Sequence, residues 1–372
     1  MSRTMTSWPV RRLLVVAVGF LAAVPLGAAA GDRQVKTTDR TLISVDAPPD
    51  RQFDFWLGTW KVNNRRLSAD GIWQDSGEAR AIIEPILGGR AIVEQWSGMV
   101  GGGEVKGFSL RAYDSRRKKW IILLNWPGKR SQGFSTMEGT FRHGRGEFYP
   151  PGAIDNGSRN LTRFTFCDPM PDSCRWDQAT SSDGGGNWRT TWIMEFSRAK
   201  GRRIDKRSVT NINTPPRRPD CSAPESRQFD FLIGEWSGTG RLRRKGSSWA
   251  NSKATLRATS MIDGCGLMTF LIIDQSKGEP VETFVAWSFN EAAGRWACQS
   301  IASDAGRLQS ATGHFEGDTA TFIQRDSLGR ARAKTEWSQI TEDRFHWRRA
   351  RSSNNGKSWT PDAEFDFTRD PS

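Results

Sequence analysis

A ten-residue stretch that occurs twice constrains the fold of this chain more than any other feature. Residues 51–60 read RQFDFWLGTW and residues 227–236 read RQFDFLIGEW, so seven of ten positions are identical at a spacing of 176 residues. Five tryptophans recur in the same order. Trp60, Trp73 and Trp120 have counterparts 176 residues later, and Trp176 and Trp188 have counterparts 171 residues later. The chain is therefore one unit written twice, and each copy has the length of an ordinary domain.

Short runs of apolar residues with a period of two fill each copy. Examples are Ala79, Ala81 and Ile83, and the later set Phe108, Leu110 and Ala112. Such runs are typical of β-strands, and they return every 10–15 residues with turn residues between them. We therefore predict an all-β fold with two tandem antiparallel β-barrels of about ten strands each.

The first thirty residues predict a cleaved signal peptide. A positively charged start with Arg3, Arg11 and Arg12 is followed by an apolar run over 13–26 and by three alanines at 28–30. Cleavage would lower the formal net charge from +13 to +10, because three arginines are lost. We expect the mature protein to be exported, to the periplasm or outside the cell, with no transmembrane segment remaining.

The predicted layout places a flexible leader at 31–50, barrel 1 at 51–198, a linker at 199–226 and barrel 2 at 227–370. The linker is strongly basic, with Lys200, Arg202, Arg203, Lys206, Arg207, Arg217 and Arg218. A solvated hinge is the simpler interpretation of this linker, and contact with an anionic envelope surface is the alternative. The chain carries no motif that reads nucleic acid, so we expect no nucleic-acid partner.

Five cysteines in an exported chain predict disulfides. Cys167 and Cys174 flank a short loop that a Cys167–Cys174 bridge would close. A Cys221–Cys265 bridge would attach the entry of the second copy to an early turn. Cys298 remains, and its strand-like surroundings favour a buried, inert thiol.

The repeated stretch itself predicts how each barrel is closed. Phe53, Asp54, Phe55 and Trp56 precede Gly58 and Trp60, so bulky residues could plug one end while Gly58 lets the chain turn into the first strand. The second copy repeats this with Phe229, Asp230, Phe231, Gly234 and Trp236. Arg198 and Arg369 end the two copies, and we expect them to lie over Trp60 and Trp236 in cation–π contact. Asp54 and Asp230 are expected to cap the turn.

These residues also carry a family resemblance. Gly58-x-Trp60 on a first strand, with Arg198 on the last, resembles the calycins, the lipocalin and fatty-acid-binding superfamily. The fuller Phe-Asp-Phe-Trp-x-Gly-x-Trp stretch, followed by Gly88-Gly89-Arg90, Glu94, Tyr113-Asp114 and Trp120, resembles a bacterial family of unknown function with a predicted calycin-like barrel. The second copy departs from this pattern, with Leu232 in place of Trp56 and Phe270 aligned with Glu94, so a ligand site shared by both barrels is not expected.

No motif for catalysis or for metal binding is present, and we expect neither cofactor nor metal. The three histidines have no His or Cys partner at metal-ligand spacing. The nitrobindins, which are related to the calycins, hold haem through a single histidine inside a barrel. His346 is the one candidate for that role, but strand alternation puts it with Arg344 and Arg348 on a polar face opposite Phe345 and Trp347.

The leading functional hypothesis is an exported, non-catalytic protein that holds a small hydrophobic or amphipathic ligand in a barrel lumen. Its candidate ligand residues are Trp96, Trp126 and Trp287, which do not belong to the repeated tryptophans, and Glu94, which has no counterpart. One alternative is a packed barrel that acts as a structural or interaction module of the cell envelope. Another is a calycin-like isomerase or cyclase that shapes a reactive ligand.

Overall fold

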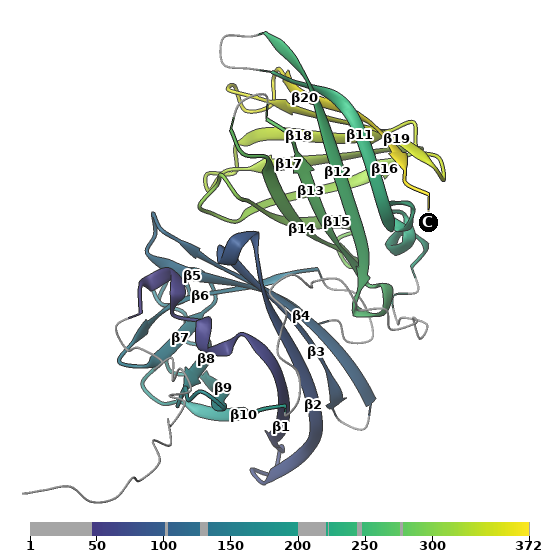
Figure 1. The fold of residues 1–372 in the computed structure, drawn as a ribbon. Helices are drawn as coiled ribbons and strands as arrows, with labels where there is room; N and C mark the ends of the chain where they lie inside the picture. Colours follow the sequence, from purple (N-terminus) through teal and green to yellow (C-terminus); the bar gives the residue numbers. More distant parts are fainter. Residues whose placement is uncertain are drawn as a thin grey trace, which may run out of the picture. The chain divides into compact units, whose positions relative to one another are not determined.

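A computed structural model of the chain describes residues 47–100, 103–126, 133–199, 221, 223–243, 248–275 and 278–371. These residues form two closed antiparallel barrels of ten strands each, one in each copy of the repeat (Figure 1). The all-β, two-barrel prediction is confirmed. The predicted signal peptide, most of the leader and most of the basic linker lie outside the described residues.

Barrel 1 is a meander in which each strand hydrogen-bonds to the next along the chain. Its strands are β1 (Gly58–Leu67), β2 (Trp73–Ile86), β3 (Ala91–Val100), β4 (Gly103–Asp114), β5 (Lys119–Asn125), β6 (Ser135–Arg142), β7 (Arg145–Tyr149), β8 (Leu161–Cys167), β9 (Ser173–Ser181) and β10 (Arg189–Arg198).

Barrel 2 has the same strand order. Its strands are β11 (Gly234–Arg243), β12 (Trp249–Met261), β13 (Gly266–Ile273), β14 (Val281–Asn290), β15 (Arg295–Ala302), β16 (Gln309–Glu316), β17 (Thr319–Arg325), β18 (Ala331–Ser338), β19 (Arg344–Arg351) and β20 (Thr360–Arg369).

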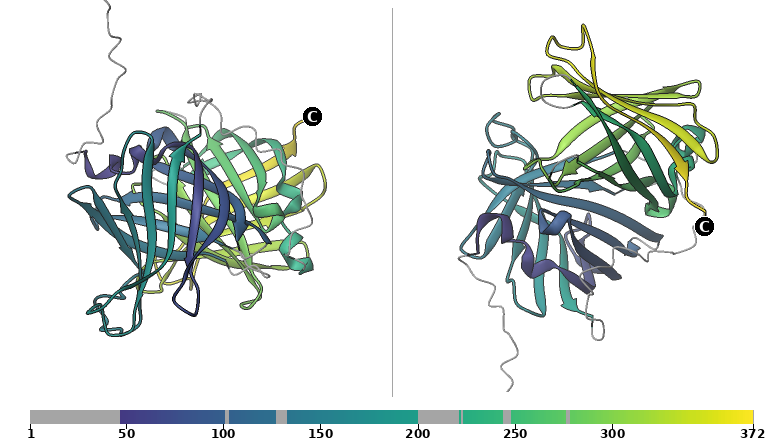
Figure 2. Two further views of the ribbon diagram at one scale, coloured as in Figure 1. Left: turned by 90° about the horizontal axis from the view of Figure 1, so that it is seen from below. Right: turned by 45° about the horizontal axis from the view of Figure 1, so that its top comes forward.

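Each barrel closes by pairing its first strand with its last. Trp60 on β1 lies opposite Arg198 on β10, and Trp236 on β11 lies opposite Arg369 on β20. The pairs of strands can be followed by colour in Figure 2, purple beside teal and green beside yellow. Residues with alternate burial show why these segments are strands. On β1, Trp60 and Val62 are buried inside the barrel while Lys61 and Asn63 are exposed.

The repeated stretch plugs one end of each barrel. In barrel 1 it forms the short 3₁₀ helix η2 (Asp54–Trp56), which precedes Gly58 with a φ of 130°. The Phe53 ring is fully buried, with centroids 4.9 Å from the Trp120 ring and 5.1 Å from the Phe166 ring. Edge-to-face contacts at this spacing are the favoured geometry of aromatic pairs. The plug therefore rests on rings from strands β5 and β8.

Arg198 and Trp60 form what we call the closure clamp of barrel 1. The Arg198 Cζ lies 3.8 Å from the centroid of the Trp60 ring, and its guanidinium donates to the carbonyl oxygens of Phe55 and Leu57 in the plug. The Trp60 indole N–H donates to the Trp56 carbonyl at 2.7 Å. The clamp thus ties the first strand, the last strand and the plug together.

The closure clamp of barrel 2 repeats this arrangement with Trp236 and Arg369. The Arg369 Cζ lies 4.2 Å from the Trp236 ring centroid, and the guanidinium donates to the Phe231 and Ile233 carbonyls, each at 2.7 Å. Both cation–π pairs expected from the sequence are present.

The two plug aspartates do not cap their turns, which corrects the expectation for Asp54 and Asp230. Neither 3₁₀ helix has a side-chain cap hydrogen bond. Asp54 instead pairs with Arg51 at 2.6 Å, and Asp230 pairs with Arg227 at 2.5 Å. The arginine three residues earlier reaches each carboxylate because one turn of 3₁₀ helix brings positions i and i+3 to the same side.

One of the two predicted disulfides is formed. Cys221 and Cys265 are bonded, with a Cα–Cα distance of 5.4 Å. The predicted Cys167–Cys174 bridge is wrong, since both thiols are free. In the β8–β9 register Cys167 lies opposite Arg175, so Cys174 is one residue out of register and its side chain faces the buried core of barrel 1. Cys298 is buried, and burial raises the pKa of its thiol to about 12, which is typical of an unreactive cysteine.

Candidate ligand-binding lumen

A buried polar group occupies the inner face of β3 and β4 in barrel 1. It consists of Glu94, Ser109 and Arg111, and we call it the lumen triad. Glu94 is 3 % exposed and Arg111 is 2 % exposed. The Ser109 hydroxyl donates to Glu94 Oε2 at 2.6 Å, and Arg111 donates to Ser109 Oγ at 2.6 Å and to Glu94 Oε2 at 3.2 Å. A buried ion pair with this connectivity satisfies most of its own charge.

The Arg111 guanidinium is also enclosed by aromatic rings. Its Cζ lies 3.6 Å from the Trp56 ring centroid and 5.6 Å from that of Phe166. Burial lowers the pKa of Arg111 to about 10, against the opposing charge and hydrogen bond of Glu94. Arg111 therefore remains a cation near neutral pH, held between a carboxylate and the face of an indole ring.

An internal cavity of about 190 Å³ adjoins the lumen triad. Its walls are mostly aromatic and aliphatic, and two of the triad side chains belong to them. The lining residues are Trp56, Glu94, Arg111, Ile122, Leu124, Trp126, Ser135, Phe164, Phe166, Trp176, Gln178, Trp192, Met194 and Phe196.

The lining changes in exposure from one end of the cavity to the other. Trp56, in the plug, is 1 % exposed, whereas Trp126, Phe164 and Gln178 are partly exposed and Ser135 is exposed. The cavity therefore extends from the plugged end of the lumen toward solvent. Its apolar walls and few convergent polar groups are the usual composition of a small-molecule site.

Two hydrogen-bond donors at the cavity have no partner. They are the indole N–H of Trp56 and the Nε–H of Arg111, and both are buried. Leaving a buried donor unpaired is costly, so such groups are rare and point to a missing partner.

Barrel 2 fills the equivalent space with a tryptophan. Its strand register places Thr269 where barrel 1 has Glu94, Val285 in place of Ser109, and Trp287 in place of Arg111. The Trp287 indole donates to Thr269 Oγ1 at 3.1 Å, so a neutral hydrogen bond replaces the buried ion pair.

The Trp287 ring is packed on several sides by the core of barrel 2. Its centroid lies 5.0 Å from that of Phe229, 5.1 Å from that of Phe322 and 5.3 Å from that of Trp337. The sequence alignment of Phe270 with Glu94 is wrong by one residue. Barrel 1 has a bulge between β1 and β2 at Asn64 that barrel 2 lacks, and this shifts β3 by one position against β13.

Three of the four predicted ligand residues lie together in barrel 1. Glu94 and Trp126 line the cavity, and Trp96 is buried with its ring centroid 5.4 Å from that of Trp126. Trp287 belongs instead to the filled core of barrel 2. The sequence analysis missed Trp56 and Arg111 as cavity residues. A lone arginine on the opposite face from Phe108, Leu110 and Ala112 was the signal for Arg111.

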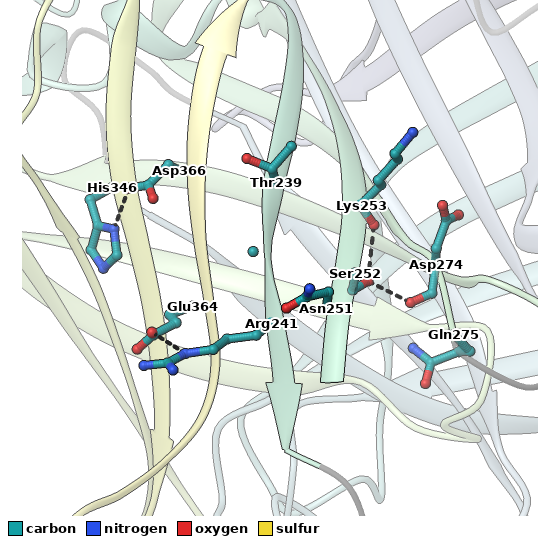
Figure 3. A pocket seen from close by; sticks show the side chains of 11 residues that line it. Thr239, Arg241, Asn251, Ser252, Lys253, Asp274, Gln275, His346, Glu364 and Asp366 are labelled. Carbon is teal, nitrogen blue, oxygen red and sulfur yellow. Dashed lines mark hydrogen bonds and ion pairs between the residues drawn. The ribbon is translucent and has the colours of Figure 1, made fainter. Parts of the chain in front are cut away.

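His346 lies on the outer face of barrel 2, as strand alternation predicted. Figure 3 shows it beside an outer concavity of about 710 Å³ between β11, β12, β19 and β20. The His346 Nδ1 lies 2.7 Å from Asp366 Oδ1, and Arg241 pairs with Glu364 at 2.5 Å. The charged side chains here pair with one another, and His346 faces away from the lumen in which a haem would lie.

Two searches of the described residues concern metals and membranes. No group of three or more His, Cys, Asp or Glu side chains in this part of the chain could hold a metal ion. None of its helices has both the length and the apolar character needed to span a bilayer.

Comparisons with known proteins identify no family for this chain. No protein-family model matches the sequence, and no curated protein matches it. Among solved structures, it is similar to an S-type phycobiliprotein lyase from Guillardia theta, with 11 % identity, 39 % of this chain and 91 % of that chain covered, and a TM-score of 0.24.

A protein of unknown function from the DUF3598 family of Nostoc punctiforme is 12 % identical, with 86 % of this chain and 97 % of that chain covered and a TM-score of 0.22. Kievitone hydratase from Nectria haematococca is 9 % identical, with 90 % and 94 % covered and a TM-score of 0.18. Likenesses this weak carry no argument about the activity of this chain.

Proposed function

We propose that this protein is a non-catalytic binding protein and that barrel 1 holds a small amphipathic molecule in its lumen. The observation that carries the proposal is the cavity beside the lumen triad. Engineered apolar cavities of about 150 Å³ bind benzene, so a cavity of about 190 Å³ suits an occupant of one aromatic ring with a short substituent. The closed barrel supplies rigid walls for such a site.

Barrel 2 has a structural role in this proposal. Trp287 occupies the position of Arg111, and Leu232 occupies the position of Trp56, so the deep part of its lumen is packed with apolar side chains. The packed-barrel hypothesis is thus favoured for one copy and the ligand hypothesis for the other.

We also propose that the protein works outside the cytoplasm. The Cys221–Cys265 disulfide supports this, because disulfides persist mainly in oxidising compartments. Contact between the basic linker and an anionic envelope surface is part of the proposal, and it rests on sequence alone.

Native mass spectrometry of the full mature protein, exported by a bacterial host, tests the binding function. We expect an added mass that survives gentle ionisation and leaves on denaturation, or uptake of added benzene by protein that carries no such mass. The comparison variant is the triple substitution Trp56→Leu, Glu94→Thr and Arg111→Trp, which copies the residues of barrel 2. We expect it to fold and to take up neither. Absence of both signals in the wild-type protein would overturn the proposed function.

A further inference from the structure

The unpaired donors at the cavity specify the chemistry of its occupant. Trp56 and Arg111 each present a buried N–H without a partner, and both side chains line the cavity. Among the described lining residues, the buried side-chain atoms without a partner are donors only. An occupant that completes these hydrogen bonds must therefore carry an acceptor oxygen or nitrogen.

The charge balance of the lumen argues against an anionic occupant. Arg111 supplies one buried positive charge and Glu94, 3.2 Å away, supplies one buried negative charge. A bound carboxylate would add a second negative charge that has no buried cation of its own, and desolvating an uncompensated ion is strongly unfavourable. Arg66 is the cation next nearest to the lining. It stacks on Trp192 with its Cζ 3.8 Å from the ring centroid, and it is not among the lining residues.

We infer that the cavity of barrel 1 selects an uncharged ligand with an aromatic or compact apolar body and one hydrogen-bond acceptor, such as a ketone, ester or amide. Trp56 Nε1 and Arg111 donate to that acceptor, and Glu94 excludes carboxylates of the same shape. This inference rests on the proposed function and narrows its ligand class.

Three probes with the same number of non-hydrogen atoms separate the possible interactions. Acetophenone carries a neutral acceptor, benzoate carries a negative charge, and isopropylbenzene carries neither. Calorimetric titration of the full mature protein at neutral pH should show acetophenone binding at least about tenfold more tightly than either of the others, since one satisfied buried hydrogen bond changes affinity by about that factor.

The variant Glu94→Gln tests the charge argument with a gain of binding. It keeps the shape of the side chain and leaves Arg111 as an uncompensated cation. We expect its affinity for benzoate to rise at least about tenfold and to exceed its affinity for acetophenone. Thermal melting followed by circular dichroism checks that the variant is folded.

The variant Trp56→Phe tests the donor. It removes the indole N–H and keeps an aromatic ring, so the preference for acetophenone over isopropylbenzene should fall by about threefold or more. Trp337→Phe is the matched control. The Trp337 indole N–H is also buried without a partner, but it lies in barrel 2, where barrel 1 has Phe166. This control should bind all three probes as the wild-type protein does.

The outcomes separate this inference from the proposed function. Benzoate binding more tightly than acetophenone to the wild-type protein would overturn the inference and leave the binding function standing. Equal binding of acetophenone and isopropylbenzene would mean that water alone satisfies the two donors, and it would also overturn the inference. If none of the three probes binds and benzene is not taken up, the proposed function falls and the inference falls with it.

Discussion

Arg111 and Trp287 occupy equivalent positions on β4 and β14, and they give their barrels different interiors. The arginine requires a carboxylate and leaves a cavity, whereas the tryptophan needs only a threonine hydroxyl and fills the space. Buried ion pairs contribute little net stability, and removing one partner is costly because the other charge is left unpaired. The lumen triad is therefore retained more for what it binds than for what it stabilises.

Arg111→Met should destabilise the protein by about 3–5 kcal/mol, because Glu94 would be left as a buried charge without its cation. The double variant Glu94→Thr with Arg111→Trp should lose less than about 1.5 kcal/mol, since barrel 2 already holds this pair in the same fold. Urea denaturation followed by circular dichroism measures both changes in the free energy of unfolding. Equal destabilisation by the single and double variants would contradict this account.

Glu84 predicts a pH dependence at a single residue. It is half-buried on β2, and burial raises the pKa of its carboxyl above the ordinary value of 4.5. The raised pKa means that ionisation costs more in the folded state than in the unfolded state. Stability is therefore lost as pH rises from the ordinary pKa through the raised one.

Glu84→Gln removes that loss. We expect the variant to melt about 1–3 °C above the wild-type protein at neutral pH and at the same temperature well below pH 4.5. Thermal melts across this pH range measure the difference. An advantage that is independent of pH would show that the effect is not electrostatic.

At the scale of elements, the disulfide joins two parts of barrel 2 that are distant in sequence. Cys221 precedes the 3₁₀ helix η4 (Pro224–Arg227), and Cys265 follows η6 (Ile262–Gly264) and leads into β13. The bridge closes a loop with a sequence separation of 44. Cross-links of this loop length restrict the unfolded chain and typically stabilise by about 2–4 kcal/mol.

Replacing Cys221 and Cys265 by serine should lower the free energy of unfolding by about that amount and should abolish the effect of dithiothreitol on stability. The matched control is the double serine variant at Cys167 and Cys174, whose thiols are free in the structure. That control should keep the full response to dithiothreitol. A smaller response would show that these two thiols form a bond in solution.

The sequence predicted the elements better than it predicted their faces. The repeated Trp and Arg residues identified both closure clamps, because a cation–π pair across the closing strands needs only those two residues in register. The face of Glu94 could not be predicted in the same way. Its neighbours Ile92 and Val93 point to opposite faces, and both are buried, so the alternation on β3 does not show which face is inside.

Register was the other element that pattern analysis could not supply. The extra residue of the bulge at Asn64 moved the counterpart of Glu94 from Phe270 to Thr269. A shift of one residue reverses the face of every side chain on a strand. The spacing of the repeated tryptophans could not reveal it, since Trp73 and Trp120 flank the bulge and the compensating change in the β3–β4 turn.

At the scale of the whole molecule, the two barrels share one fold and differ in their interiors. We therefore expect one ligand per chain, bound in barrel 1. Native mass spectrometry with acetophenone in excess counts bound molecules directly. Introducing the barrel 1 residues into barrel 2, with Leu232→Trp, Thr269→Glu, Val285→Ser and Trp287→Arg, should raise the count to two if the variant folds. A count of two in the wild-type protein would contradict the assignment of a filled barrel 2.

The closure clamps have a consequence for how such a chain can evolve. Trp60 and Arg198 hold the barrel shut, yet neither is among the residues that line the cavity. Because the first and last strands of each copy are hydrogen-bonded neighbours, a duplicated gene segment delivers a second barrel whose closure is complete as inherited. Mutations inside the lumen can then change, narrow or remove a binding site in one copy while the other keeps the original specificity.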